Sequence, residues 1–176
     1  MNHNALIMEM TQYYSGQPHR IQHFMKVYAY SKMIGEQEGL SEREQDILEA
    51  AAIVHDIGIK VSEEKYGDCI GKHQEEEGPA EAKKMLKRLG YDDTVTERVC
   101  YLVGHHHTYK GIDGMDYQIL VEADFLVNLF ENETGNQPAE AVFEKIFRTE
   151  TGKMIGQAMF ATDRNIEWTE VGGMIK

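Results

Sequence analysis

The chain has 176 residues, of which 41% are hydrophobic and 27% charged, a composition typical of one folded domain. The formal charge is −12, so neither a nucleic-acid duplex nor an anionic membrane is expected as the main partner. No apolar run approaches the roughly 20 residues needed to cross a bilayer, and no secretory signal is recognisable. Cys69 and Cys100 lack the CxxC spacing of a thiolate metal site. A cytoplasmic protein is therefore expected.

The first part of the chain predicts two helices. A short one covers residues 4–15, and a longer one runs between Pro18 and Gly39, residue types that favour the start and the end of a helix. On the longer helix, His23 recurs in phase with apolar residues at helical spacing. This histidine is therefore expected to face the protein core.

A third helix is predicted over residues 41–58. It begins with a capping box, in which the side chains of Ser41 and Glu44 satisfy each other's free backbone N–H groups. Leu48 and His55 share its apolar face, and the pattern ends at a glycine. A second histidine is thus expected in the core, directly followed by an aspartate.

The rest of the chain also has helical periodicity. His106 falls in phase on one of these helices, and Asp124 lies on the apolar face of another. The tail from about residue 149 contains several glycines and threonines and has no clear period; a loop with a short strand or hairpin is one structure compatible with it. The predicted helices cover residues 79–90, 92–106, 116–133 and 139–147. An all-α single domain is the predicted fold class.

Five ionisable residues therefore lie at positions where burial is unfavourable unless something compensates them. One such histidine alone is more often a hydrogen-bonded structural residue than a ligand, but five together favour convergence on one cation. Imidazole nitrogen and carboxylate oxygen suit divalent iron, manganese, cobalt, nickel or zinc. The five residues are His23, His55, Asp56, His106 and Asp124.

The order of these residues resembles the HD-domain superfamily of metal-dependent phosphohydrolases. The segment "HRIQHFMKVYAYSKMIG" is similar to the family's first ligand helix, and "LEAAAIVHDIGIK" is similar to its second. "VEADFLVNLFE" is similar to the helix that supplies the last aspartate. The resemblance covers residues 18–132 and implies one HD-type helical domain over residues 1–176, with a C-terminal extension over 133–176.

The resemblance implies a ligand set for a first metal ion, made of His23, His55, Asp56 and Asp124. Subfamilies with two ions add histidines between the HD pair and the last aspartate. One matching context here is "GKHQEEEGPAEAKKML", which contains His73. The other is "VCYLVGHHHTY", where His106 is favoured, His105 is a close second and His107 is least favoured. One ion or two remain open, because these additional histidines also fit a polar helix end and a solvated loop.

The resemblance also implies phosphoester hydrolysis by a water molecule whose pKa the metal lowers. Arg20 and Lys60 are the basic residues expected to hold phosphate oxygens, although both also fit solvated surface charges. Glu122 points away from Asp124 on its helix and is expected at the surface or around the site. Specificity is expected from the 61–72 and 107–116 loops.

The function predicted from sequence is therefore a metal-dependent phosphohydrolase that uses one or two divalent ions. Its substrate is expected to be a small phosphorylated metabolite, with a nucleotide favoured. A non-catalytic, metal-binding regulatory or ligand-sensing module is the alternative, followed by a di-iron oxygenase. A homo-oligomer is compatible with the sequence.

Overall fold

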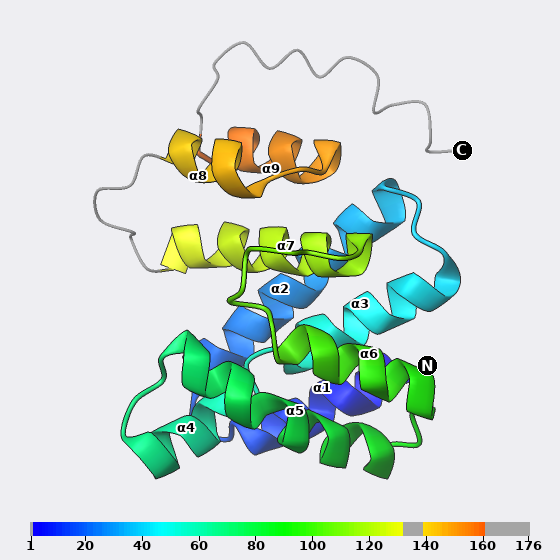
Figure 1. The fold of residues 1–176 in the computed structure, drawn as a ribbon, viewed down its shortest axis with the longest axis vertical. Helices are drawn as coiled ribbons and strands as arrows, with labels where there is room; N and C mark the ends of the chain where they lie inside the picture. Colours follow the sequence, from blue (N-terminus) through cyan, green and yellow to red (C-terminus); the bar gives the residue numbers. More distant parts are fainter. Residues whose placement is uncertain (1, 132–138, 161–176) are drawn as a thin grey trace.

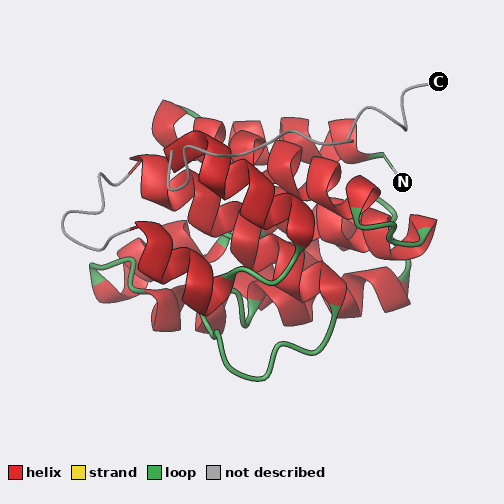
Figure 2. Ribbon diagram, turned by 90° about the horizontal axis from the view of Figure 1, so that it is seen from above, coloured by secondary structure: helices red, strands yellow, loops and turns green. Residues whose placement is uncertain are grey.

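The computed structural model describes residues 2–131 and 139–160, and these residues form nine α-helices and no strand (Figures 1 and 2). The prediction of an all-α fold is confirmed. None of the helices in these two ranges combines the length and the apolar character that a membrane crossing requires. The helices are α1 (His3–Tyr13), α2 (Pro18–Gln37), α3 (Glu42–Val54), α4 (Gly58–Tyr66), α5 (Gly71–Arg88), α6 (Asp93–Val103), α7 (Met115–Glu131), α8 (Ala139–Ile146) and α9 (Glu150–Phe160).

The predicted helix signals are present at the ends of α2 and α3. Pro18 is the first residue of α2, and Gly39, with a φ of +74°, adopts the left-handed conformation just after its end. The Ser41 hydroxyl accepts a hydrogen bond from the backbone N–H of Glu44, whose carboxylate accepts one from the backbone N–H of Ser41. These two helices therefore have the boundaries that their sequences favour.

Two helices form the centre of the fold. The second half of α3 is buried on all sides, and α7 is buried along almost its whole length. α2 packs against both of them, and α6 packs against α3. Figure 1 shows α7 between the α8–α9 pair and the remaining helices. Of the residues predicted to bind metal, Asp124 lies on α7 and His55 directly follows α3. His23 lies on α2, and His106 follows the end of α6.

The fifth helix begins earlier than predicted, at Gly71 instead of Pro79. A proline inside a helix removes one backbone hydrogen bond and normally ends the helix there. Here α5 packs closely on α4 and on α6. A Cβ atom added to Gly58 of α4 would collide with the Gln74 carbonyl oxygen, and one added to Gly78 would lie 2.6 Å from Cγ1 of Val103 on α6. Tertiary packing therefore continues α5 through the proline.

Two other predicted segments are wrong. The helix predicted over 41–58 ends at Val54, and after a short turn α4 occupies much of the predicted 61–72 loop. The segment from Glu150 to Phe160 is helix α9 instead of a loop with a strand or hairpin. The end of that predicted segment, residues 161–176, lies outside the described residues.

Candidate metal centre

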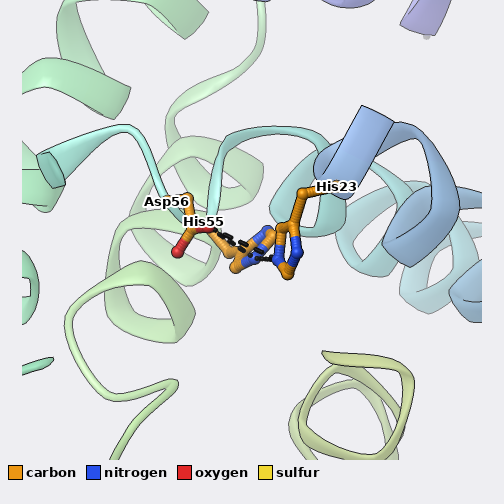
Figure 3. A group of neighbouring side chains, drawn as sticks. All are labelled: His23, His55 and Asp56. Carbon is orange, nitrogen blue, oxygen red and sulfur yellow. Dashed lines mark hydrogen bonds and ion pairs between the residues drawn. The ribbon is translucent and has the colours of Figure 1, made fainter. Parts of the chain in front are cut away.

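The His55–Asp56 pair lies in the turn between α3 and α4. The turn is held from α1, because the Tyr14 hydroxyl donates to the Asp56 carbonyl oxygen over 2.7 Å and the Tyr13 hydroxyl donates to the Ile57 carbonyl oxygen over 3.2 Å. His55 itself is fully buried. Figure 3 shows the His55 ring beside that of His23 from α2, with Asp56 next to them.

Imidazole nitrogens and carboxylate oxygens from three parts of the chain converge at this turn. His23 Nε2 lies 3.2 Å from His55 Nε2 and 3.1 Å from Asp124 Oδ1 on α7. Asp56 Oδ2 lies 3.4 Å from both histidine Nε2 atoms. The four residues expected around a first metal ion are therefore side by side, although up to 101 positions separate them in sequence.

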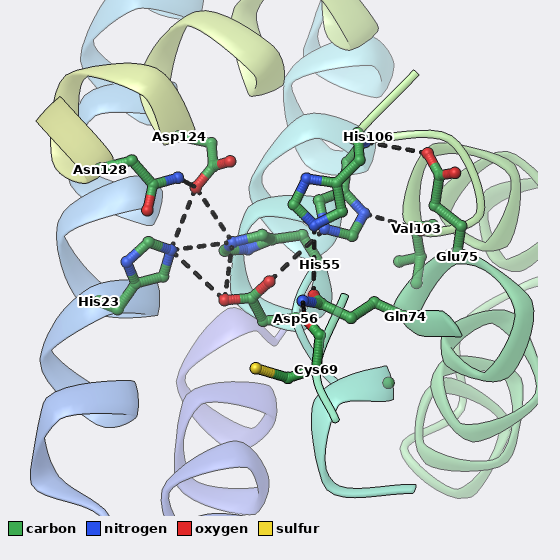
Figure 4. A network of polar contacts seen from close by, with 12 residues as sticks. His23, His55, Asp56, Cys69, Gln74, Glu75, Val103, His106, Asp124 and Asn128 are labelled. Atoms are coloured by element: carbon green, nitrogen blue, oxygen red, sulfur yellow. Dashed lines mark hydrogen bonds and ion pairs between the residues drawn. The ribbon is translucent and has the colours of Figure 1, made fainter. Parts of the chain in front are cut away.

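His106 approaches the same centre from the opposite side. Its Nε2 atom lies 3.5 Å from Asp56 Oδ1, the carboxylate oxygen that does not face His23. Figure 4 shows Asp56 between His23 and Asp124 on one side and His106 on the other. The carboxylate of Asp56 can thus contact two groups of ligands at once.

Hydrogen bonds fix the orientation of all three inward-facing histidines. The Nδ1 atom of His23 contacts Glu131 Oε2 over 2.7 Å. The corresponding atoms of His55 and His106 donate to the main-chain carbonyl oxygens three residues earlier, over 2.9 Å and 2.8 Å. Donation from Nδ1 leaves the lone pair on Nε2, which is the arrangement that metal-binding histidines require.

The charges around the centre favour a cation. Burial lowers the pKa of His23, but the hydrogen bond with Asp124 and the charges of Asp56 and Asp124 together raise it to about 9. Burial raises the pKa of Asp56 and Asp124, but the neighbouring histidines hold both well below their usual range. Both carboxyl groups are therefore ionised at neutral pH, although Asp124 is buried and Asp56 is half-buried.

The residues fit a divalent transition-metal ion. His106 Nε2 is buried and makes no hydrogen bond to any residue that the structure describes. Such an unpaired nitrogen is costly unless it serves as a ligand. The available donors are imidazole nitrogen and carboxylate oxygen, a set that suits iron, manganese, cobalt, nickel or zinc.

The other predicted histidines are placed differently. Nδ1 of His73 contacts Asp68 Oδ1 over 2.8 Å, and its ring stacks on Tyr66, outside the described clusters that could hold an ion. His105 hydrogen-bonds the Tyr101 carbonyl oxygen over 2.7 Å. His107, which the sequence favours least, groups with Asp56 and His106 so that one ligand atom of each lies within 4.8 Å of the others.

An open cleft of about 300 Å³ leads to the centre. Arg20 lines it, and its guanidinium contacts Gln17 Oε1 over 2.5 Å and Glu63 Oε1 over 2.6 Å. Lys60 does not: its ammonium lies over the Tyr13 ring and lines a separate cleft. The lining residues are His19, Arg20, His23, Asp56, Ile59, Cys69, Gln74, His107, Asp124, Asn128 and Glu131.

Two residues of α7 that the sequence reading missed also line this cleft. Asn128 donates a hydrogen bond to Asp124 Oδ1 over 2.8 Å, and Glu131 contacts His23 as described above. They follow Asp124 at i+4 and i+7, which places all three on one helix face. A polar stripe on an otherwise apolar helix was the signal in the sequence that could have indicated them.

The fold and the site together define an all-α protein with a cluster of His and Asp side chains that could hold a divalent metal ion. The model of the HD domain matches residues 20–147, and the chain belongs to this family of metal-dependent hydrolases. A crystal structure described as a predicted HD superfamily hydrolase from an uncultured Thermotogales bacterium is similar over 89% of this chain and 82% of that one. Its TM-score is 0.62 and its identity 23%, a likeness that concerns the fold. A search of the curated proteins found no match.

Proposed function

We propose that this protein is a phosphohydrolase that acts on a small phosphorylated metabolite, with nucleotides as the first substrate class to test. The observation that carries the proposal is the convergence of His23, His55, Asp56 and Asp124 at the end of a cleft that Arg20 also lines. Membership of a metal-dependent hydrolase family supports the reaction type.

His23, His55, Asp56 and Asp124 would hold one divalent ion, and Asp56 with His106 and His107 offers a place for a second. A bound ion would lower the pKa of a water molecule and offset negative charge on a phosphoryl group. The chain itself supplies orientation, because the hydrogen bonds at Nδ1 and the hydroxyl of Tyr14 keep the ligating side chains in place.

Arg20 is the residue that we assign to the substrate phosphate. It follows Gln17 and precedes His23 by about one turn of α2, so its charge lies near the mouth of the centre. Contacts with Gln17 and Glu63 hold the guanidinium, whose planar set of N–H donors matches phosphate oxygens. In a protein with a formal charge of −12, a local cation of this kind would help an anionic substrate to approach.

The proposal is tested by metal content and phosphate release with the purified protein. Mn²⁺, Fe²⁺ or Co²⁺ is supplied, and nucleoside mono- and diphosphates and cyclic nucleotides are offered as substrates. Asp56→Ala should lose both metal and turnover, whereas Glu9→Gln, which changes a carboxylate that pairs with Arg88 outside the cleft, should keep both. Absence of turnover with every metal and substrate would contradict the proposal. Ligand-dependent thermal stabilisation without turnover would instead support the regulatory alternative.

A further inference from the structure

Glu131, the last residue of α7, joins two helices at the rim of the metal centre. Its Oε2 atom lies 2.7 Å from Nδ1 of His23, and its Oε1 atom lies 2.5 Å from Nζ of Lys26. Both partners belong to α2, separated by about one turn. The two oxygens of one carboxylate are therefore used to hold one histidine and one lysine.

The partner of His23 differs in charge from the partners of the other two inward histidines. His55 and His106 donate from Nδ1 to the carbonyl oxygens of Ala52 and Val103, which carry no net charge. A carboxylate fixes the ring in the same way and also increases the electron density on the opposite nitrogen. Of the three nitrogens that face the centre, His23 Nε2 is therefore the one strengthened by a carboxylate at the opposite nitrogen of its ring.

His23 is also the inward histidine that borders the open cleft. It is 8% exposed, whereas His55 and His106 are 0% and 1% exposed. Packing restrains the two buried rings on all sides, so their orientation depends less on a single hydrogen bond. The orientation of the His23 ring relies more on Glu131.

Lys26 reduces the effect that the negative charge of Glu131 has on His23. Its ammonium, which also lies over the Phe130 ring, neutralises charge on the carboxylate that contacts His23. Removal of the ammonium should leave more negative charge at Nδ1 of His23. The charge of the Glu131 carboxylate, reduced by the Lys26 ammonium, therefore determines how strongly His23 Nε2 can bind a cation.

From these contacts we propose that Glu131 is a positioning residue for the metal centre. We propose further that Lys26 limits how far Glu131 strengthens His23 as a metal ligand. Glu131 holds His23 with the proton on Nδ1 and strengthens Nε2 as a ligand. This inference rests on the proposed metal centre, because it concerns how tightly that centre binds an ion and which variant changes the affinity.

A series of variants separates two contributions of Glu131 to metal affinity, its negative charge and its hydrogen bond with Nδ1 of His23. Glu131→Ala removes both, and Glu131→Gln keeps an oxygen that can accept from Nδ1 but removes the charge. Lys26→Met removes the opposing ammonium. The matched control is Glu9→Gln, which changes a carboxylate that pairs with Arg88 outside the cleft.

The dissociation constant for Zn²⁺ or Co²⁺ is measured by calorimetry on the metal-free proteins. Glu131→Ala should weaken binding by roughly 10- to 100-fold, and Glu131→Gln should lie between this variant and the wild type. Lys26→Met should bind the ion more tightly than the wild type, and an unchanged dissociation constant would contradict the role of Lys26. The affinity of Glu9→Gln should equal that of the wild type. In the zinc complex, nitrogen NMR should detect a proton on Nδ1 of His23 that becomes less downfield in Glu131→Gln and is lost or moved in Glu131→Ala.

Circular dichroism melting of the metal-free variants shows whether each one folds. If Glu131→Ala does not fold, the isosteric Glu131→Gln becomes the test variant. A dissociation constant for folded Glu131→Ala within about twofold of the wild-type value, with an unchanged Nδ1 resonance, would overturn the inference and leave the metal centre intact. Absence of metal binding by the wild type would overturn the proposed function and this inference with it. The two failures are therefore distinguishable.

Discussion

The Tyr14 hydroxyl donates a hydrogen bond to the main-chain carbonyl oxygen of Asp56, so that a side chain of the N-terminal region holds the backbone of the metal centre. Tyr14 is 1% exposed, and Tyr14→Phe would leave that carbonyl without its partner. We expect a loss of about 1 kcal/mol in the free energy of unfolding and weaker metal binding. Chemical denaturation and calorimetry measure the two effects.

The control for this variant is Tyr13→Phe, which removes the neighbouring hydrogen bond to Ile57. Because Ile57 carries no ligand, this change should affect stability with less effect on metal affinity. Equal affinities for the wild type and Tyr14→Phe would show that the turn keeps its geometry without the tyrosine.

Metal affinity should depend on pH through His23. In the metal-free protein its pKa is raised to about 9, so the ring carries a proton at neutral pH that an ion must displace. Below about pH 9, each unit of decrease in pH should therefore weaken binding by up to about tenfold. Calorimetry at about pH 6.5 and at about pH 8.5 tests this, and proton release is measured from the buffer dependence of the heat. Equal affinities at the two pH values would contradict the assignment of His23.

The raised pKa of His23 also affects the stability of the metal-free fold, but with the opposite dependence on pH. A folded-state pKa above the unfolded value of about 6.5 means that His23 stabilises the fold fully below that pH. This contribution is lost as the pH rises through about 9. The unfolding midpoint of the metal-free protein, compared with that of His23→Gln, should show a difference that becomes smaller over this range.

The two cysteines should differ in reactivity. Cys69 is exposed and lines the metal cleft, whereas Cys100 is half-buried and donates to the Pro79 carbonyl oxygen over 3.3 Å. Burial raises the pKa of the Cys100 thiol, which lowers its fraction of reactive thiolate. Iodoacetamide followed by peptide mass spectrometry should find Cys69 modified first. Cys69→Ser is the control, and faster modification of Cys100 would contradict the described placement of the two residues.

Glu122 should be important for stability. The sequence suggests a surface or peripheral position, but Glu122 is completely buried and accepts hydrogen bonds from the backbone N–H groups of Arg148 and Thr149 and from the side chains of Gln118 and Thr149. Glu122→Ala would leave several buried donors unpaired, and we expect a loss of about 3 kcal/mol in the free energy of unfolding. Urea unfolding measures it.

Glu140→Ala on α8 is the matched control, since that glutamate is exposed and should be nearly neutral. A second test is Gly152→Ala, because a Cβ atom at this position would collide with Glu122 Oε2. If both Glu122→Ala and Gly152→Ala unfold like the wild type, this hydrogen-bonded junction does not stabilise the fold.

Much of the metal centre could be predicted from sequence, because helical periodicity indicates which side chains face the core. His23, His106 and Asp124 each occur at the spacing of apolar neighbours, and the structure buries all three. The end of the helix at Val54 has no local signal, because His55 keeps helical dihedral angles of −53° and −41°. The hydrogen bonds that hold the turn come from Tyr13 and Tyr14, which are distant in sequence. Local sequence signals do not contain such contacts.

Positions one residue apart were harder to assign. Gln74 lines the cleft and His73 does not, because α5 already begins at Gly71 and successive helical residues point about 100° apart. A helix predicted to start at Pro79 leaves both side chains in a loop without a defined direction. The placement of Lys60 on the Tyr13 side likewise depends on α4, a helix that the sequence pattern did not indicate.

The long sequence separation within the centre gives a bound ion a role in folding as well as in chemistry. An ion held by His23, His55 and Asp124 would act as a cross-link that closes loops of 32 and 101 residues between central helices. At a free metal concentration about 1,000 times the dissociation constant, this link would add about 4 kcal/mol to the stability of the folded state. Metal starvation would then remove activity and also shorten the lifetime of the folded chain.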